Sequence, residues 1–449
     1  MTVTTDVPID PWPAPTAHQP VDATVMMPGS KSATNRALIL AAISDGTSRL
    51  RRPLRSRDTL LMAAALRALG VAVVDDRSDW VVHGEFPLRA TPGALIDCGN
   101  AGTVARFTPA LATLAHGDLV FDGDPRMRER PLNPLLDALR TLGARIDGNR
   151  MPLTVHGRGR LTGGDVTVDA SASSQLVSGL LLAAPRYDHG VTVRHVGSRL
   201  PSWPYLEMTV ADLRAAGASV EVDVDVDRTK AGVAARWSVA PGRILAHDRI
   251  IEPDINSAAA FLAAAAATGG RIVLADWPAA TVQPGRMLPE LLTAMGCAVT
   301  QTSVGLEVRG PQRLRGIDVD LTDYGEAAPT LAALAVLADS PSRLRGIAHL
   351  RLQETDRLAA LAVELGRLGA AVTVTDDGLA ISPAPLSGAV LDPRADHRLA
   401  MAYAVVGLVV PGVQVHDIAT TGKTVPHFHR LWAQMLAGTG TLDETVRQR

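Results

Sequence analysis

The chain contains few aromatic residues and has almost no excess charge. Of its 449 residues, 3% are Phe, Trp or Tyr, and the formal net charge is −2. Proteins that bind nucleic acid commonly combine a basic surface with aromatic side chains on which bases stack. The composition therefore argues against a nucleic-acid partner, and an anion site would have to come from local clustering of cations.

Cysteine is scarce as well, and long apolar runs are missing. Cys98 and Cys297 lie far apart with no Cys/His cluster, which argues against a disulfide framework and a zinc site. The longest apolar stretches, residues 258–267 and 401–410, are shorter than the roughly 20 residues that cross a bilayer. The first 27 residues lack the basic start of a signal peptide. We expect a cytoplasmic protein without a membrane partner.

Lysine is the rarest of the common charged residues. Of the 44 Lys and Arg residues, only Lys31, Lys230 and Lys423 are lysines. Arg stays protonated and binds through a planar fork, whereas Lys is a compact charge that can shift its pKa. Lys31 and Lys423 lie in small-residue loops with Gly nearby and a hydroxyl residue directly after, where backbone N–H groups and an ammonium can hold phosphate. We predict anion-binding roles for these two, and an ordinary surface position for Lys230.

One pattern recurs along the chain: a helix ending in Gly, a short strand, a polar turn and a second strand. Gly at the end of a helix adopts the left-handed conformation. The alternating apolar and polar residues that follow predict half-buried strands, and the Asp/Asn/Gly turns predict hairpins. The helix-ending glycines are Gly70, Gly143, Gly217, Gly296 and Gly369.

These glycines are 73, 74, 79 and 73 residues apart, so the pattern fits about six times into 449 residues. Such a period predicts a repeat architecture, and the length predicts more than one domain. We expect two similar domains of three α/β units each, residues 1–28 plus 251–449 and residues 29–250. A helix over 428–436 would open the sixth unit, and a strand over 23–27 would complete it.

Small polar residues and cations gather where helices are expected to start. A helix N-terminus attracts anions, and Arg binds carboxylate or phosphate through two parallel bonds. Each motif alone is also typical of a helix cap or a surface ion pair, but together they predict a cleft between domains that holds several anionic groups. A nucleotide P-loop is excluded, because Asp417 stands where the motif before Lys423 needs Gly. The motifs lie at residues 28–36, 97–106, 126–131, 171–175, 201–205, 323–326, 353–357, 396–398 and 421–424.

Read in order, these motifs resemble the 5-enolpyruvylshikimate-3-phosphate (EPSP) synthase family over residues 28–426. The resemblance implies an α/β fold of two similar domains, each of three βαβαββ repeats, in an enolpyruvyl transferase-like inside-out barrel with the active site in the interdomain cleft. It implies transfer of the enolpyruvyl group of phosphoenolpyruvate to the 5-hydroxyl of shikimate 3-phosphate in the shikimate pathway. By the same resemblance, we expect inhibition by glyphosate and a monomeric state. We expect no metal or organic cofactor.

The resemblance also implies a set of site residues. Glu326 would accept the proton of the 5-hydroxyl, Glu354 or Lys31 would move the proton of the methylene carbon, and Lys31 and Lys423 would stabilise developing charge. Asn100 and Tyr205 would line the site. Shikimate 3-phosphate would bind Lys31, Ser32, Arg36, Ser173, Ser174, Gln175, Ser202 and Glu326. Phosphoenolpyruvate would bind Lys31, Gly102, Arg130, Gln175, Arg357, Arg398 and Lys423.

The sequence departs from the common family pattern at several positions. Gln353 stands where many members have Lys, Glu326 where Asp is common, His349 where Asn is frequent and Trp203 where a basic residue is frequent. Two alternatives remain open. An enolpyruvyl transferase acting on UDP-N-acetylglucosamine would carry Lys-Asn in the first loop and a Cys on a lid, and a repeat-built RNA-binding protein would be basic and aromatic.

Overall fold

The structure, a computed structural model, describes residues 8–224, 235–438 and 441–442. The chain forms two compact units, and both termini belong to the same one. Unit 1 consists of Met1–Pro28 and Pro253–Arg449, and unit 2 consists of Gly29–Glu252. The second boundary lies two residues after the predicted position between 250 and 251. Lys230 lies outside the described residues.

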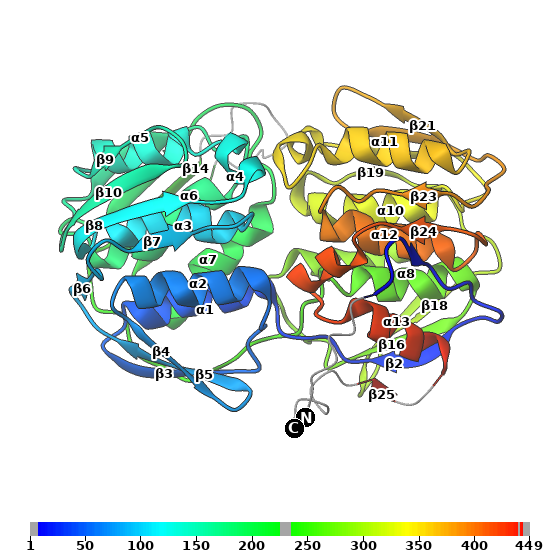
Figure 1. Ribbon diagram of the computed structural model, residues 1–449, viewed down its shortest axis with the longest axis horizontal. Coiled ribbons are helices and arrows are strands. Elements are labelled where there is room, and N and C mark those ends of the chain that lie inside the picture. Colours follow the sequence, from blue (N-terminus) through cyan, green and yellow to red (C-terminus); the bar gives the residue numbers. More distant parts are fainter. Residues whose placement is uncertain (1–7, 225–234, 439–440, 443–449) are drawn as a thin grey trace. The chain divides into compact units, whose positions relative to one another are not determined.

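Within its described residues, unit 2 contains three sheets, and each joins parallel strands to an antiparallel hairpin (Figure 1). The first repeat has α1 (Lys31–Ala42), β3 (Gly46–Arg51), α2 (Arg57–Ala68), β4 (Ala72–Asp76), β5 (Asp79–Gly84) and, from the end of the unit, β15 (Arg249–Ile250). The second has β6 (Leu88–Arg89), β7 (Leu95–Asp97), α3 (Gly102–Ala112), β8 (Ala115–Asp122), α4 (Pro125–Glu129), α5 (Asn133–Thr141), β9 (Arg145–Asp147) and β10 (Leu153–Arg158). The third has β11 (Gly164–Val168), α6 (Gln175–Ala183), η1 (Ala184–Arg186), β12 (Val191–His195), α7 (Trp203–Ala215), β13 (Val220–Val224) and β14 (Ala235–Val239).

The described part of unit 1 also contains three sheets, built from both the N-terminal and the C-terminal parts of the chain. The fourth repeat has β2 (Asp22–Val25), α8 (Ala259–Thr268), β16 (Arg271–Ala275), η2 (Pro284–Met287), α9 (Leu288–Ala294), β17 (Ala298–Gln301), β18 (Gly305–Arg309) and β25 (Thr441–Leu442). The fifth has β19 (Asp318–Asp320), η3 (Thr322–Ala327), α10 (Ala328–Ala335), β20 (Ser342–Arg345), η4 (Ala348–Leu352), α11 (Arg357–Arg367), β21 (Ala371–Val374) and β22 (Leu379–Ser382). The sixth has β23 (Val390–Leu391), α12 (His397–Gly407), β24 (Gln414–Val415), η5 (Ile418–Lys423), α13 (Phe428–Leu436) and, from the N-terminal segment, β1 (Trp12–Pro13).

The repeat predicted from the glycines is confirmed. The five glycines have φ values of 87°, 104°, 87°, 102° and 94°, and each follows a helix directly or by a short cap. The strand after each glycine pairs with the next strand in an antiparallel hairpin: β4 with β5, β9 with β10, β13 with β14, β17 with β18 and β21 with β22. Local sequence therefore specified these elements correctly.

The completion of the sixth repeat differs from the expectation. The helix over 428–436 is present as α13, but the strand near 23–27 belongs to another sheet. β2 lies between β16 and β25 and runs parallel to both, so it is the first strand of the fourth repeat. The strand that joins the sixth sheet is β1, antiparallel to β24. Parallel neighbours need a crossover connection, which is why β2 and β15 come from distant parts of the chain.

Each unit has buried helices at its centre, and in unit 2 three of them begin at predicted site residues, Lys31, Gly102 and Gln175. The central helices are α1, α3 and α6 in unit 2 and α8, α10 and α12 in unit 1, and they are apolar around most of their surface. A Cβ atom at Gly179 of α6 would lie 2.0 Å from the Arg106 carbonyl oxygen of α3, so this glycine permits a close helix approach. In the described part of the chain, every helix is too short or too polar to span a membrane.

Candidate active site

In unit 2, three predicted side chains and Arg106 converge around Gly102 at the start of α3. We call Asn100, Gly102, Arg106, Arg130 and Gln175 the Gly102 cluster. Arg130 donates from Nη1 to the Asn100 carbonyl oxygen at 3.2 Å and to Oδ1 of Asn100 at 3.1 Å. Arg106 donates from Nη1 to Oε1 of Gln175 at 3.2 Å. Two nearly buried guanidinium groups therefore lie at a helix N-terminus, an environment that favours a small anion.

Gly102 leaves the space that this arrangement needs. A Cβ atom at position 102 would lie 2.7 Å from Arg106 Nη1, 2.9 Å from Arg130 Nη2 and 2.9 Å from Gln175 Oε1. The backbone of Gly102 is not left-handed, so a turn that requires positive φ does not explain this glycine. The missing side chain is explained by the three polar groups that occupy its place.

Lys31 is the first residue of α1 and forms an ion pair with Asp58. Its Nζ atom donates to Asp58 Oδ2 at 3.3 Å, and the Asp58 side chain is only 3% exposed. Ser30 caps the helix by accepting a hydrogen bond from the Ala33 N–H. Asp58 was not predicted from the sequence, because it lies 27 residues away at the start of α2 and belongs to no motif.

Arg36 lies in the interior of unit 2 and uses its guanidinium within the protein. It donates to Thr209 Oγ1 at 2.8 Å, to the Ser32 carbonyl oxygen at 3.2 Å and to the Tyr205 carbonyl oxygen at 2.9 Å. The guanidinium also stacks over Phe107, 5.4 Å from the ring centroid. Burial lowers the pKa of Arg36 to about 10, which leaves it charged at neutral pH. These contacts connect α1, α3 and α7, and substrate binding by Arg36 stays a prediction.

The serine motifs stand at the starts of α6 and α7. Ser173 Oγ accepts a hydrogen bond from the Gln175 N–H at 3.3 Å, and Ser174 is buried. Ser202 precedes α7 with φ 58° and ψ 43°, a left-handed conformation that is costly for a non-glycine residue and clusters at functional sites. Trp203 packs on Trp237 with ring centroids 5.4 Å apart, so its buried side chain is part of the core of unit 2.

In unit 1, Glu354, Arg357, Asp396 and Lys423 form one network of ion pairs, the Glu354 network. Lys423 Nζ donates to Glu354 Oε1 at 2.7 Å, and Arg357 Nη2 donates to Glu354 Oε2 at 3.0 Å. Arg357 Nε donates to Asp396 Oδ2 at 2.7 Å. Asp396 also caps α12 by accepting from the Arg398 N–H at 2.8 Å. The four side chains are at most 10% exposed.

The carboxylates of the Glu354 network offset the burial of Arg357. Burial alone would lower the pKa of Arg357, but the adjacent Asp396 and Glu354 carboxylates outweigh it and raise the pKa. Both Glu354 oxygens accept bonds from cations in this state, so an incoming anion that draws Lys423 or Arg357 away would leave Glu354 more basic.

Glu326 lies near this network, in η3. Among the residues that the structure describes, none forms a hydrogen bond with Oε2 of Glu326, although this atom is buried. His349 lies beside it: a Cβ atom at Gly325 would be 2.8 Å from His349 Nε2. Burial lowers the pKa of His349 to about 4, against the opposing effect of Glu326. His349 is therefore neutral at physiological pH, and Glu326 has an oxygen available for a ligand.

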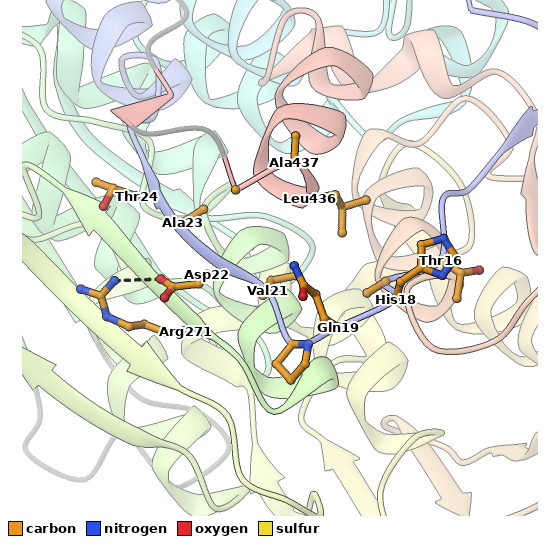
Figure 2. Close-up of a pocket in the computed structure, with 13 residues that line it drawn as sticks. Thr16, His18, Gln19, Val21, Asp22, Ala23, Thr24, Arg271, Leu436 and Ala437 are labelled. Atoms are coloured by element: carbon orange, nitrogen blue, oxygen red, sulfur yellow. Dashed lines mark hydrogen bonds and ion pairs between the residues drawn. The ribbon is translucent and has the colours of Figure 1, made fainter.

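A cavity of about 730 Å³ lies elsewhere in unit 1 (Figure 2). It is lined by the chain from Thr16 to Thr24 and by the end of α13. Arg271, the cation on its wall, is paired with Asp22 at 2.9 Å and with Glu307 at 2.8 Å (Figure 2 shows the first pair). The predicted site residues do not line it, so size alone does not identify the functional site.

Comparison with solved structures defines the class of protein. The enolpyruvyl transferase NikO from Streptomyces tendae has a TM-score of 0.70 at 20% identity, and the match covers 94% of this chain and 95% of that chain. EPSP synthase from Acinetobacter baumannii has a TM-score of 0.75 at 25% identity, and the match covers 95% of this chain and 97% of that chain. The two units of three repeats therefore form an enolpyruvyl transferase fold.

Comparison of sequences defines the family. Residues 15–432 match the family model of EPSP synthase (3-phosphoshikimate 1-carboxyvinyltransferase). A 3-phosphoshikimate 1-carboxyvinyltransferase of Mycobacterium ulcerans (strain Agy99) is 50% identical over 436 residues, which cover 96% of this chain and 99% of that protein. The chain belongs to the EPSP synthase family, and the resemblance found in the sequence is confirmed.

Proposed function

We propose that this protein transfers the enolpyruvyl group of phosphoenolpyruvate to the 5-hydroxyl of shikimate 3-phosphate and releases phosphate. Family membership supports this reaction, as does the near full-length relative named for it. The alternative acceptor, UDP-N-acetylglucosamine, is not favoured by these relatives.

One structural observation carries the proposal. The two loop lysines that the sequence singled out, Lys31 and Lys423, each pair with a nearly buried carboxylate, Asp58 in the first turn of α2 and Glu354 in the loop before α11. Each substrate is an anion with a phosphate and a carboxylate. Their binding therefore needs cations at more than one position, and Lys31 and Lys423 provide two compact ones. A carboxylate partner holds each ammonium in place until a substrate anion competes for it.

In this proposal the Gly102 cluster binds phosphoenolpyruvate with Lys31. Arg130 offers a guanidinium and Gly102 lets the small substrate approach the backbone, while Gln175 stands between the two substrates. The starts of α1, α6 and α7 bind shikimate 3-phosphate, through Ser32, Arg36, Ser173, Ser174 and Ser202, with Tyr205 alongside.

Glu326 accepts the proton of the 5-hydroxyl while the 5-oxygen of shikimate 3-phosphate attacks C2 of phosphoenolpyruvate. A proton from Glu354 or Lys31 adds to C3. The resulting tetrahedral adduct then loses phosphate from C2 and a proton from the methyl carbon, which restores the double bond. Lys423, Arg357 and Arg398 bind the phosphoenolpyruvate anion, and Lys423 with Lys31 stabilises the charge on the departing phosphate. Oε2 of Glu326 is buried and accepts no hydrogen bond from the part of the chain that the structure describes, which supports its role as the base.

The remaining parts of the proposal concern the setting of the reaction. The site residues of unit 2 and those of unit 1 act on the same substrates, in the interdomain cleft expected from the sequence. The reaction uses no metal or organic cofactor. The enzyme works as a monomer in the bacterial cytoplasm, without nucleic acid or membrane, and glyphosate competes with phosphoenolpyruvate.

The test is phosphate release by the purified protein from phosphoenolpyruvate with each acceptor. Turnover is expected with shikimate 3-phosphate and not with UDP-N-acetylglucosamine. Turnover only with the latter, or with neither, would refute the proposal. The product should carry the enolpyruvyl group on the 5-oxygen by NMR spectroscopy.

A further inference from the structure

The N-terminal segment of unit 1 lies along the part of the sixth repeat that leads to Lys423. β1 pairs with β24, with Trp12 opposite Val415, and Figure 1 shows this dark-blue strand beside β24. Two further backbone bonds extend the contact, from the Ala14 N–H to the Val413 oxygen at 3.0 Å and from the Ala17 N–H to the Leu408 oxygen at 2.9 Å. The segment thus follows the chain from the end of α12 to β24.

Packing against α12 fixes this segment in place. Ala14 is buried, and a Cβ atom at Gly407 would lie 2.5 Å from the Ala14 Cβ atom. Gly407 is the last residue of α12. Asp396 caps the N-terminus of this helix, and Arg398 is its second residue. Only a glycine at this position permits such close contact with the N-terminal segment.

Asp10, at the start of the segment, binds the turn before η5. Its Oδ1 atom accepts a hydrogen bond from the Asp417 N–H at 2.9 Å and contacts His416 Nδ1 at 3.3 Å. Asp417 has φ 42° and ψ 46°, and a non-glycine residue held in this region needs support from its surroundings. η5 begins at the next residue and ends at Lys423, whose ammonium binds Glu354.

We propose that Asp10 is a positioning residue for Lys423. Its Oδ1 atom stabilises the left-handed turn at Asp417, and this turn sets the path of η5 and so the place of the Lys423 ammonium. The inference rests on the proposed function, because it assigns Lys423 to phosphoenolpyruvate. The hydrogen-bond acceptor is the property that matters, since the Asp10 charge lies close to the Asp417 carboxylate.

The test compares Asp10→Ala, which removes the acceptor, with Asp10→Asn, which keeps Oδ1 and removes the charge. The control is Asp318→Ala, because the Asp318 side chain has a similar exposure, 58% against 61%, and pairs with Arg345 in the same unit. Asp10→Ala should raise the KM for phosphoenolpyruvate about fivefold, as expected for one lost hydrogen bond, with a smaller change in kcat. Asp10→Asn and the control should keep the wild-type KM.

Hydrogen exchange gives a second readout that does not need turnover. The backbone amides of residues 417–424 should exchange faster in Asp10→Ala than in wild type, Asp10→Asn or the control. Unchanged exchange and KM in Asp10→Ala would overturn the inference, as would equal damage by Asn and Ala or a lower Tm alone. If the wild type releases no phosphate from shikimate 3-phosphate and phosphoenolpyruvate, the proposed function fails, and exchange alone decides whether Asp10 holds the turn.

Discussion

The side chain missing at Gly102 gives the sharpest prediction, because its surroundings are defined on three sides. In Gly102→Ala the new methyl would lie 2.7 Å from Arg106 Nη1 and 2.9 Å from both Arg130 Nη2 and Gln175 Oε1. Ordinary contacts of this kind are about 3.5 Å, so the polar groups must move by roughly 0.6 to 0.8 Å. Arg106 and Arg130 are 2% and 5% exposed, which leaves them little room to move outward.

A shift of this size falls on the phosphoenolpyruvate site in the proposed function. Misplacement by about 1 Å can cost around 10²-fold in rate, so a rise in the KM for phosphoenolpyruvate of about 10-fold is expected. Glyphosate is longer than phosphoenolpyruvate, and the methyl should raise its inhibition constant more, about 10²-fold or above, because selectivity is the difference of two binding energies. Folding should change little, since Ala is favoured over Gly in a helix by up to about 1 kcal/mol.

The assay measures phosphate release to obtain both constants, and calorimetry to obtain Tm, in wild type and Gly102→Ala. Gly366→Ala is the matched control: it is also a helical glycine, in α11, but within the described part of the chain no non-neighbouring atom lies within 4 Å of its added Cβ. The control should keep both constants and gain slightly in Tm. Equal increases of the two constants in Gly102→Ala, or a loss of Tm alone, would refute the reasoning.

Three further predictions follow from single residues. Lys31→Arg should reduce turnover by at least about 10²-fold although charge is kept, because the guanidinium cannot replace a compact ammonium beside Asp58; the control Lys230→Arg should be active, and an active Lys31→Arg enzyme would contradict the role. Glu326→Gln should bind both substrates with near wild-type affinity and slow the single-turnover rate by about 10²–10⁴-fold, as for a lost general base; an unchanged rate would remove Glu326 from that role. His349 has a folded pKa lowered from 6.5 to about 4, so the unfolded chain binds more protons and stability should fall as pH drops from 6.5 towards 4. Urea unfolding at pH 7 and pH 5 measures this loss in the free energy of unfolding, and His349→Gln should make the loss smaller by on the order of 1–3 kcal/mol. An equal pH dependence in wild type and His349→Gln would show that the fold does not lower the pKa of His349.

Parts of the candidate site could be predicted from the sequence because their signals are local, and their roles in binding stay predictions. Lys31, Gly102, Gln175 and Arg357 each stand at the start of a helix, where small polar residues mark both the cap and an anion site. Asp58 could not be found in this way, since nothing in its neighbourhood distinguishes it from an ordinary first-turn acid. The structural use of Arg36 was also hidden, because its partner Thr209 lies 173 residues away.

The six-fold repeat and its hairpins could be predicted from the sequence alone, because helix ends and strand periods depend on neighbouring residues. The two loop lysines could be singled out because lysine is scarce in the composition. Tertiary structure decided which strand completes which sheet: β1 joins the sixth repeat and β2 the fourth, although either could have been paired from its pattern. The packing of Arg106, Arg130 and Gln175 around position 102 explains why that residue is Gly. The fold also brings Glu354 into contact with Lys423, which lies 69 residues further along the chain. Such choices depend on packing between segments far apart in the chain, where many pairings satisfy the same local pattern and only one fills the interior.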